Sequence, residues 1–295
     1  MFSRLLVRRG GTRSRQLLSP LKHAFAQEAA VILQGKRCII YGAAGAIGSA
    51  VARTFAREGA QLFLAGRTKE KLDALAQCIH AEGGSAHAAR VDALDEQSIR
   101  EHAHAVVEQA GGIDVMLNAV GFAHVQGVPF AELTFDDFQV PVQAYTRTIF
   151  LTAQAVARYM APQKSGVILT LSTPGARLSG VGFLGNGTSS AAVEAMSRIL
   201  AGELGRDGIR VICMRSDAIP EAVPVSHARA AFEGMAHKKG ISVAEFLQER
   251  AEGATLLGRL PTLDQLSAFA AFAASDGASA MTGAIANLTC GSLQD

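Results

Sequence analysis

Short apolar runs alternate with helical patterns from residue 35 to the end of the chain, and this alternation restricts the fold more than any other feature. The apolar runs are almost continuous, which is typical of strands that are buried on both faces of a parallel sheet. The sequence therefore predicts an α/β fold with a doubly wound parallel sheet that is covered by helices on both sides. We expect strands over 37–41, 61–66, 85–92, 115–120, 166–173, 209–216 and 286–290, and helices over 48–58, 69–83, 94–110, 135–160 and 189–204.

The chain of 295 residues divides by composition into a leading segment and one domain. Residues 1–33 are rich in arginine, and the first acidic residue is Glu28. This composition suits a disordered extension or a mitochondrial presequence, and Pro20 favours the extension because it interrupts an amphipathic helix. We therefore predict a cytoplasmic location, with the mitochondrial matrix as the alternative. Residues 34–295 form the predicted single domain.

Within this domain, residues 225–258 have no strand pattern and are predicted to form a helical insertion. Ser242 is followed three positions later by Glu245, a capping-box pattern that predicts the start of a helix. The apolar side chains of the insertion suit either a lid over an apolar pocket or plain core packing, and we predict a lid. These side chains are Phe232, Met235, Phe246 and Leu247.

Charge, hydropathy and cysteine spacing exclude several classes of partner. The formal net charge of +2 gives no bias toward polyanions, so we expect no nucleic-acid partner. No stretch approaches the roughly 18 consecutive apolar residues of a membrane span. The cysteines have no metal-ligand spacing, so we expect free thiols and no metal site. They are Cys38, Cys78, Cys213 and Cys290.

A glycine-rich turn joins the first predicted strand to the first predicted helix. Gly42, Gly45 and Gly48 recur at every third position between these two elements. Backbone without Cβ atoms can turn tightly there, approach a pyrophosphate and present the amides of a helix N-terminus to it. A plain strand–helix turn is the alternative, but the context is the one that a dinucleotide site requires.

The turn and several later motifs resemble the short-chain dehydrogenase/reductase family, a family with a Rossmann-like fold, over residues 34–292. The usual middle glycine of the turn is Ala46 here. Segments 257–259 and 281–283 match the family's C-terminal motifs, and 118–121 matches its Asn-Asn-Ala-Gly element. The resemblance implies a nicotinamide dinucleotide cofactor. It implies as cofactor-binding residues Gly42, Gly45, Ile47, Gly48, Arg67, Asp92, Ala93, Asn118, Gly121 and Ile219.

The end of the second predicted strand bears on the choice of cofactor. A carboxylate at this place would bind the 2′-hydroxyl of an NAD ribose, but the chain has Gly66 followed by Arg67. A guanidinium suits a 2′-phosphate through paired hydrogen bonds. We therefore expect NADP(H) rather than NAD(H), and the alternative is that Arg67 is a solvated residue at a helix start.

The resemblance fails at the family's catalytic positions. The family uses a serine, a tyrosine, a lysine four residues after the tyrosine, and an asparagine on the preceding long helix. These places hold Thr173, Asn186, Ser190 and Tyr145 in this chain. An amide has no ionisable proton and a serine supplies no cation, so the usual proton donor and its activator are both absent.

Three other side chains are candidates for a substitute acid. Tyr145 would point from the long helix toward the pocket, but we expect it to pack under the sheet. His124 follows the fourth predicted strand, and its alternative is a solvated loop residue. Asp217 stands where the family has Pro-Gly after the sixth strand, at the edge where α/β sheets bind ligands, and its alternative is a cap or turn residue.

Three functions stay open on the sequence. We rank first an NADP(H)-dependent oxidoreductase that acts on a small carbonyl or alcohol substrate with a non-standard active site. The second is a catalytically inactive NADP(H)-binding relative that acts as a sensor or partner subunit, and the third is an enzyme with non-redox chemistry. By resemblance, helices 135–160 and 189–204 pair across a two-fold axis into a homodimer or homotetramer.

Overall fold

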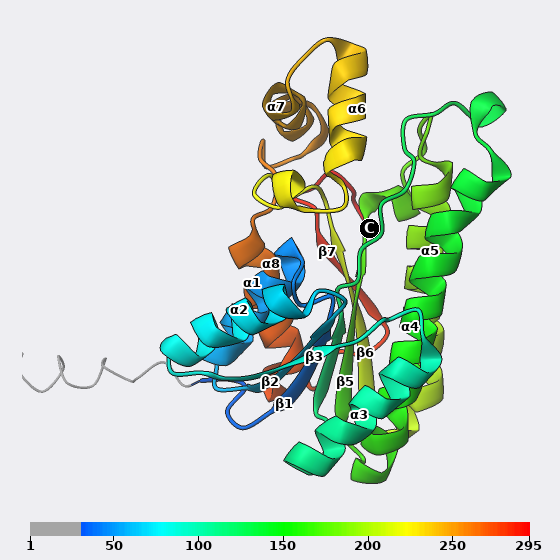
Figure 1. Ribbon diagram of the computed structural model, residues 1–295. Coiled ribbons are helices and arrows are strands. Elements are labelled where there is room, and N and C mark those ends of the chain that lie inside the picture. Colours follow the sequence, from blue (N-terminus) through cyan, green and yellow to red (C-terminus); the bar gives the residue numbers. More distant parts are fainter. Residues whose placement is uncertain (1–30) are drawn as a thin grey trace, which may run out of the picture. The chain divides into compact units, whose positions relative to one another are not determined.

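A seven-stranded sheet forms the centre of the computed structural model, which describes residues 31–295 (Figure 1). Neighbouring strands are parallel throughout, in the order β3-β2-β1-β4-β5-β6-β7. The predicted doubly wound parallel sheet is therefore confirmed. The strands are β1 (Arg37–Tyr41), β2 (Gln61–Gly66), β3 (Ser85–Arg90), β4 (Val115–Asn118), β5 (Gly166–Ser172), β6 (Ile209–Ser216) and β7 (Ala284–Leu288).

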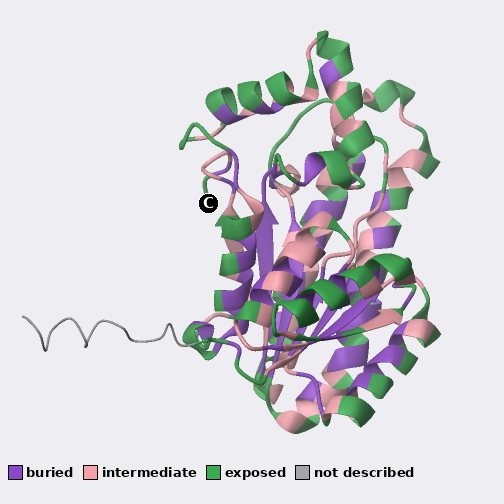
Figure 2. Cartoon of the chain, turned by 60° about the vertical axis from the view of Figure 1, so that its left-hand side comes forward, coloured by how far each residue is buried: buried purple, intermediate pink, exposed green. Residues whose placement is uncertain are grey.

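Helices cover both faces of this sheet, whose strands are largely buried (Figure 2). The strand residues alternate between two buried clusters. Ile40 and Leu62 pack with α1, α2 and α8 on one face, whereas Ile39 and Phe63 pack with α3, α4 and α5 on the other. This alternation explains why the strand sequences are apolar at almost every position. The helices are α1 (Ala46–Arg57), α2 (Lys69–Ala81), α3 (Glu96–Ala110), α4 (Phe135–Gln163), α5 (Leu184–Leu204), α6 (Arg229–Lys239), α7 (Val243–Ala254) and α8 (Leu263–Ala274).

The predicted helical insertion forms α6 and α7, which stand beyond the carboxyl ends of the strands (Figure 1). The predicted capping box is present, because Ser242 and Glu245 exchange side-chain and backbone hydrogen bonds at the start of α7. Leu247 is buried in a small apolar cluster with Val223, Ala251 and Leu260. The insertion therefore has its own core and needs no strand partner.

Several element boundaries differ from the predicted ones, most of them by two or three residues. Helix α5 begins at Leu184 rather than at residue 189, because Gly185 lies inside the helix, where a Cβ atom would come 3.1 Å from Pro141 Cγ of α4. Strand β7 begins two residues earlier than expected. Residues 1–30, and with them most of the predicted extension over 1–33, lie outside the described residues, but Leu33 is fully buried in the core of the domain.

Among the helices of the described part, none is long and apolar enough to cross a membrane.

Candidate active site

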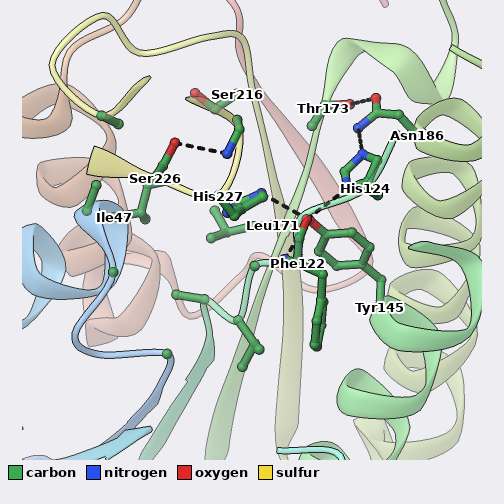
Figure 3. Close-up of a pocket in the computed structure, with 18 of the residues that line it drawn as sticks. Ile47, Phe122, His124, Tyr145, Leu171, Thr173, Asn186, Ser216, Ser226 and His227 are labelled. Atoms are coloured by element: carbon green, nitrogen blue, oxygen red, sulfur yellow. Dashed lines mark hydrogen bonds between the residues drawn. The ribbon is translucent and has the colours of Figure 1, made fainter. Parts of the chain in front are cut away.

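A cavity of about 690 Å³ opens at the carboxyl ends of the strands, where parallel α/β sheets bind their ligands. The glycine turn after β1 forms one side of the cavity, and α4 and α5 form the opposite side (Figure 3). The insertion covers it with Phe232, Met235 and Phe246, three of the four apolar residues that we predicted for the lid.

The glycine turn has the backbone geometry that close approach to a phosphate requires. Gly42 has a φ of +77°, and a Cβ atom there would lie 2.5 Å from the carbonyl oxygen of Ala119. Gly42, Gly45 and Ile47 line the cavity, and α1 begins directly after Gly45. Gly48 does not line the cavity, but a Cβ atom there would overlap the backbone of Gly42. The glycines therefore let the turn pack tightly against the backbone of Ala119 and of Gly42 itself, while the start of α1 faces the cavity, as a dinucleotide requires.

Two cations line the cavity near the start of α2. Arg67 precedes the N-cap residue Thr68, and Lys71 lies in the first turn of the helix. Asp92 and Ala93 lie beside them, and the carboxylate of Asp92 accepts a hydrogen bond of 3.0 Å from Leu94 N–H, which closes a turn. The sequence analysis missed Lys71, which lies in the first turn of α2 and has no motif of its own.

Asn118 does not line the cavity. Its side-chain amide donates to Thr152 Oγ1 over 3.0 Å and its carbonyl oxygen accepts from Val120 N–H over 3.2 Å, so it ties β4 to α4. These two hydrogen bonds fix the backbone that leads to Gly121, which lines the cavity. Ile219, which follows β6, also lines the cavity.

Three of the substituted catalytic positions, Thr173, Asn186 and Ser190, meet in one chain of hydrogen bonds (Figure 3). Thr173 Oγ1 donates to Asn186 Oδ1 over 3.2 Å and lies 2.9 Å from Ser190 Oγ. The Asn186 amide lies 3.3 Å from His124 Nε2, and His124 Nδ1 lies 2.8 Å from the carbonyl oxygen of Phe122. Because a carbonyl only accepts, the proton of this imidazole is on Nδ1 and Nε2 accepts from the amide. Burial lowers the pKa of His124, so the whole chain is uncharged.

Tyr145 packs against the buried cluster of Ile149, Val193 and Cys213, and it also lines the cavity. The hydroxyl lies 3.2 Å from Nε2 of His227 and 3.5 Å from the backbone N–H of Phe122. The ring stands edge-on to the ring of Phe122, with 5.5 Å between centroids, and to His124, with 6.1 Å. Burial raises the pKa of Tyr145, so the phenol is protonated at neutral pH.

His227 is the site residue that the sequence analysis missed. It lies in the segment that leads into α6, and its ring rests on Gly121, where any Cβ atom would overlap the imidazole. Burial, followed by the neighbouring His124, lowers the pKa of His227 to about 4. Its sequence position gives no motif, since it lies 82 positions from Tyr145 in a segment without regular spacing.

Asp217 holds the insertion in place. Its carboxylate accepts two hydrogen bonds from Arg250 of α7, over 2.7 and 3.1 Å, and others from Ser292 and the N–H of Ala218. These hydrogen bonds occupy both carboxylate oxygens, so the side chain is not free to bind a substrate. The structure therefore favours the turn-residue alternative that the sequence left open.

Tyr145 and Tyr41 are the tyrosines among the described residues that line the cavity, and Lys71 is the lysine. Tyr41 is 1% exposed and its hydroxyl points to His102, and Lys71 lies in the first turn of α2, next to the end of β2. Tyr145 is thus the phenol that this arrangement offers to a substrate.

Comparison with known proteins identifies the class that this fold and cavity define. The family profile described as enoyl-(acyl carrier protein) reductase matches residues 42–292. The chain is 31% identical to momilactone A synthase of Oryza sativa subsp. japonica over 246 residues, which cover 83% of this chain and 85% of that protein. The chain belongs to the short-chain dehydrogenase/reductase family of NAD(P)-dependent oxidoreductases, which act on alcohols and carbonyls.

Solved structures agree with this family assignment. A short-chain type dehydrogenase/reductase from Mycobacterium marinum is 28% identical, with a TM-score of 0.77 over 90% of this chain and 98% of that one. A 7α-hydroxysteroid dehydrogenase in complex with NADH and 7-oxo glycochenodeoxycholic acid is 26% identical, with a TM-score of 0.75 over 90% of this chain and 97% of that one.

Proposed function

We propose that this protein is an NADP(H)-dependent oxidoreductase that interconverts a carbonyl and an alcohol, with Tyr145 in place of the family's usual proton donor. The observation that carries the proposal is the position of the Tyr145 hydroxyl in the same cavity as the glycine turn. The chain of hydrogen bonds through Thr173, Asn186 and Ser190 supports it, because hydroxyl and amide groups can hold a carbonyl oxygen in place.

The residues of the cavity would each have a separate role in the reaction. A bound nicotinamide supplies or removes the hydride. Thr173 and Asn186 orient the substrate oxygen by hydrogen bonds. Tyr145 donates its phenolic proton to that oxygen during reduction and takes it back during oxidation. Because no lysine stands near this phenol, its pKa is raised by burial instead of lowered by a cation.

The lid end of the cavity favours an uncharged, largely apolar substrate. Phe183 and Leu178 line it together with Phe232 and Phe246 of the insertion. The guanidinium of Arg250, which also lines this end, is already paired with Asp217. A carboxylate or phosphate on the substrate would therefore lose its water without gaining a free cation.

Turnover on a panel of carbonyl compounds tests this function. We expect stoichiometric NADPH binding, and NADPH oxidation with apolar ketones or aldehydes in preference to sugar acids and phosphates. Because the usual Tyr-Lys pair is absent, rates should be well below those of ordinary family members. If NADPH binds but no compound of the panel is turned over, the second candidate function is favoured, an inactive sensor or partner subunit. That candidate is supported by Asn186 and Ser190, which replace the family's usual tyrosine and lysine.

The first prediction concerns the choice of cofactor. Arg67→Ala should weaken NADPH binding about 10- to 100-fold, because a charged hydrogen-bonded contact to the 2′-phosphate contributes about 1.5–3 kcal/mol. NADH binding should change little, since NADH has no such phosphate. Fluorescence titration of both cofactors measures the two affinities. Arg53→Ala is the matched control, since Arg53 pairs with Glu82 on the outer side of α1. Equal affinities of the unmodified protein for NADH and NADPH would contradict the proposal.

The second prediction concerns assembly. Helices α4 and α5 present Phe150 and Ile199, which are 53% and 60% exposed, although both helices carry a separate buried face. We propose that a second copy covers them and gives a homodimer or homotetramer. Light scattering at micromolar concentration should show the assembly, and Ile199→Glu should shift it toward monomer. A monomeric unmodified protein would refute the proposal.

A further inference from the structure

His227 and Tyr145 form a pair whose parts come from different elements. The tyrosine stands on α4, and the histidine stands between the 3₁₀ turn Val223–Val225 and α6. A tight turn presents this histidine, because Ser226 Oγ accepts a hydrogen bond of 3.3 Å from Ala228 N–H (Figure 3). The imidazole then rests on the bare backbone of Gly121 and reaches the phenol with Nε2.

The contacts around the phenol allow it to donate to the imidazole. The backbone N–H of Phe122 donates to the tyrosyl oxygen over 3.5 Å, which leaves the phenolic proton free to point elsewhere. In the tautomer of His227 that carries its proton on Nδ1, Nε2 accepts the phenolic proton over 3.2 Å. The titratable side chains that the structure places against this imidazole are Tyr145 of α4 and His124 of the segment after β4. His124 is uncharged and donates to the Phe122 carbonyl. Neither of these two neighbours is therefore a carboxylate that could take the phenolic proton in place of His227.

We propose that His227 is a positioning residue that acts through Tyr145 and accepts its proton when an alcohol is oxidised. This inference rests on the proposed oxidoreductase function. The substrate O–H proton passes to the tyrosyl oxygen, and the tyrosyl proton passes to Nε2. The substrate C–H bond breaks at the same time, and its electron pair and hydrogen go to the oxidised nicotinamide. His227 then releases the proton to water, and the reduction runs through the same steps in reverse.

Burial keeps the His227 imidazole uncharged at neutral pH, although it also makes the imidazole a weaker base, so the proton passes through it only transiently. Its pKa of about 4 leaves the imidazole uncharged, with a free lone pair, at every pH above about 5. Alcohol oxidation by the unmodified protein should therefore depend little on pH between about 6 and 9. Without the imidazole, oxidation requires the tyrosinate, whose pKa is raised by burial.

The test is the pH profile of kcat for alcohol oxidation in His227→Gln. Glutamine can keep a hydrogen bond to the phenol but cannot take up its proton. We expect kcat at pH 7 to fall about 10²- to 10⁴-fold, and the remaining rate to rise about tenfold per pH unit between about pH 6 and 9. In His227→Ala, added imidazole should restore part of the rate. His237→Gln is the matched control, because His237 is exposed on α6 and lies outside the cavity.

The outcomes separate this inference from the proposed function. If Tyr145→Phe abolishes turnover and His227→Gln keeps the unmodified rate and a flat profile, only the role of His227 is wrong. A pH-independent loss in His227→Gln would mean a purely structural role and would also overturn it. NADPH binding that is at least about tenfold tighter in His227→Ala would show that the ring occupies cofactor space, against the proposal. No turnover in the unmodified protein would overturn both.

Discussion

Tyr145→Phe is expected to lower kcat for carbonyl reduction by about 10²- to 10⁴-fold, the usual contribution of a positioned acid or base. Hydride transfer to a carbonyl produces an alkoxide, which must be protonated. Thr173 and Asn186 can hold the oxygen but cannot release a proton at neutral pH, and the carboxylate of Asp217 is occupied by hydrogen bonds from Arg250. Phenylalanine keeps the ring packing against Phe122, so NADPH affinity should stay unchanged.

Tyr159→Phe is the matched control for this prediction. Tyr159 lies on the same helix, and its hydroxyl also has a histidine partner, His104, at 3.3 Å, but it lies outside the cavity. Steady-state kcat and KM with a substrate from the panel, together with NADPH titration, measure both variants. If Tyr145→Phe reduces the same ketone at the unmodified rate, another group supplies the proton and the proposed site is wrong.

The fold was predictable because local patterns decide it. Nearly continuous apolar strands require a sheet that is covered on both faces, and the glycine turn marks where the first strand meets α1. The start of α5 was not predictable in the same way. Gly185 looks like a turn residue in the sequence, whereas its function is to let α5 approach Pro141 of α4, a contact that depends on two distant segments.

The site was predictable only where a motif fixes it. Gly42, Arg67 and Asp92 follow strand ends, and the topology brings such positions to one edge. The residue that a given side chain contacts could not be predicted in this way, because such contacts depend on how distant segments of the chain fold together. No sequence spacing predicts that the His227 ring packs against Gly121 or that Asp217 accepts a hydrogen bond from Arg250.

A buried ion pair beneath the active site leads to the second large effect that we expect. The Arg215 guanidinium of β6 binds both carboxylate oxygens of Glu194 on α5, over 2.7 and 2.8 Å, and the two side chains are only 3% and 6% exposed. Arg215→Met should lower the free energy of unfolding by about 3–5 kcal/mol, because the Glu194 charge stays buried with only the Ser172 hydroxyl to compensate it. Glu194→Leu should cost less, since Arg215 keeps its bond to Asp295.

Urea denaturation at a fixed protein concentration tests this prediction through a double-mutant cycle. The variant with both Arg215→Met and Glu194→Leu should be more stable than Arg215→Met alone, because it leaves no buried charge behind. Lys69→Ala is the control, since its pair with Asp73 is more than two-fifths exposed and should contribute less than about 1 kcal/mol. If the double variant loses as much free energy of unfolding as the two single variants together, the prediction is wrong. Because Glu194 also accepts from Ser172, directly before Thr173, the doubly substituted protein should fold yet lose turnover.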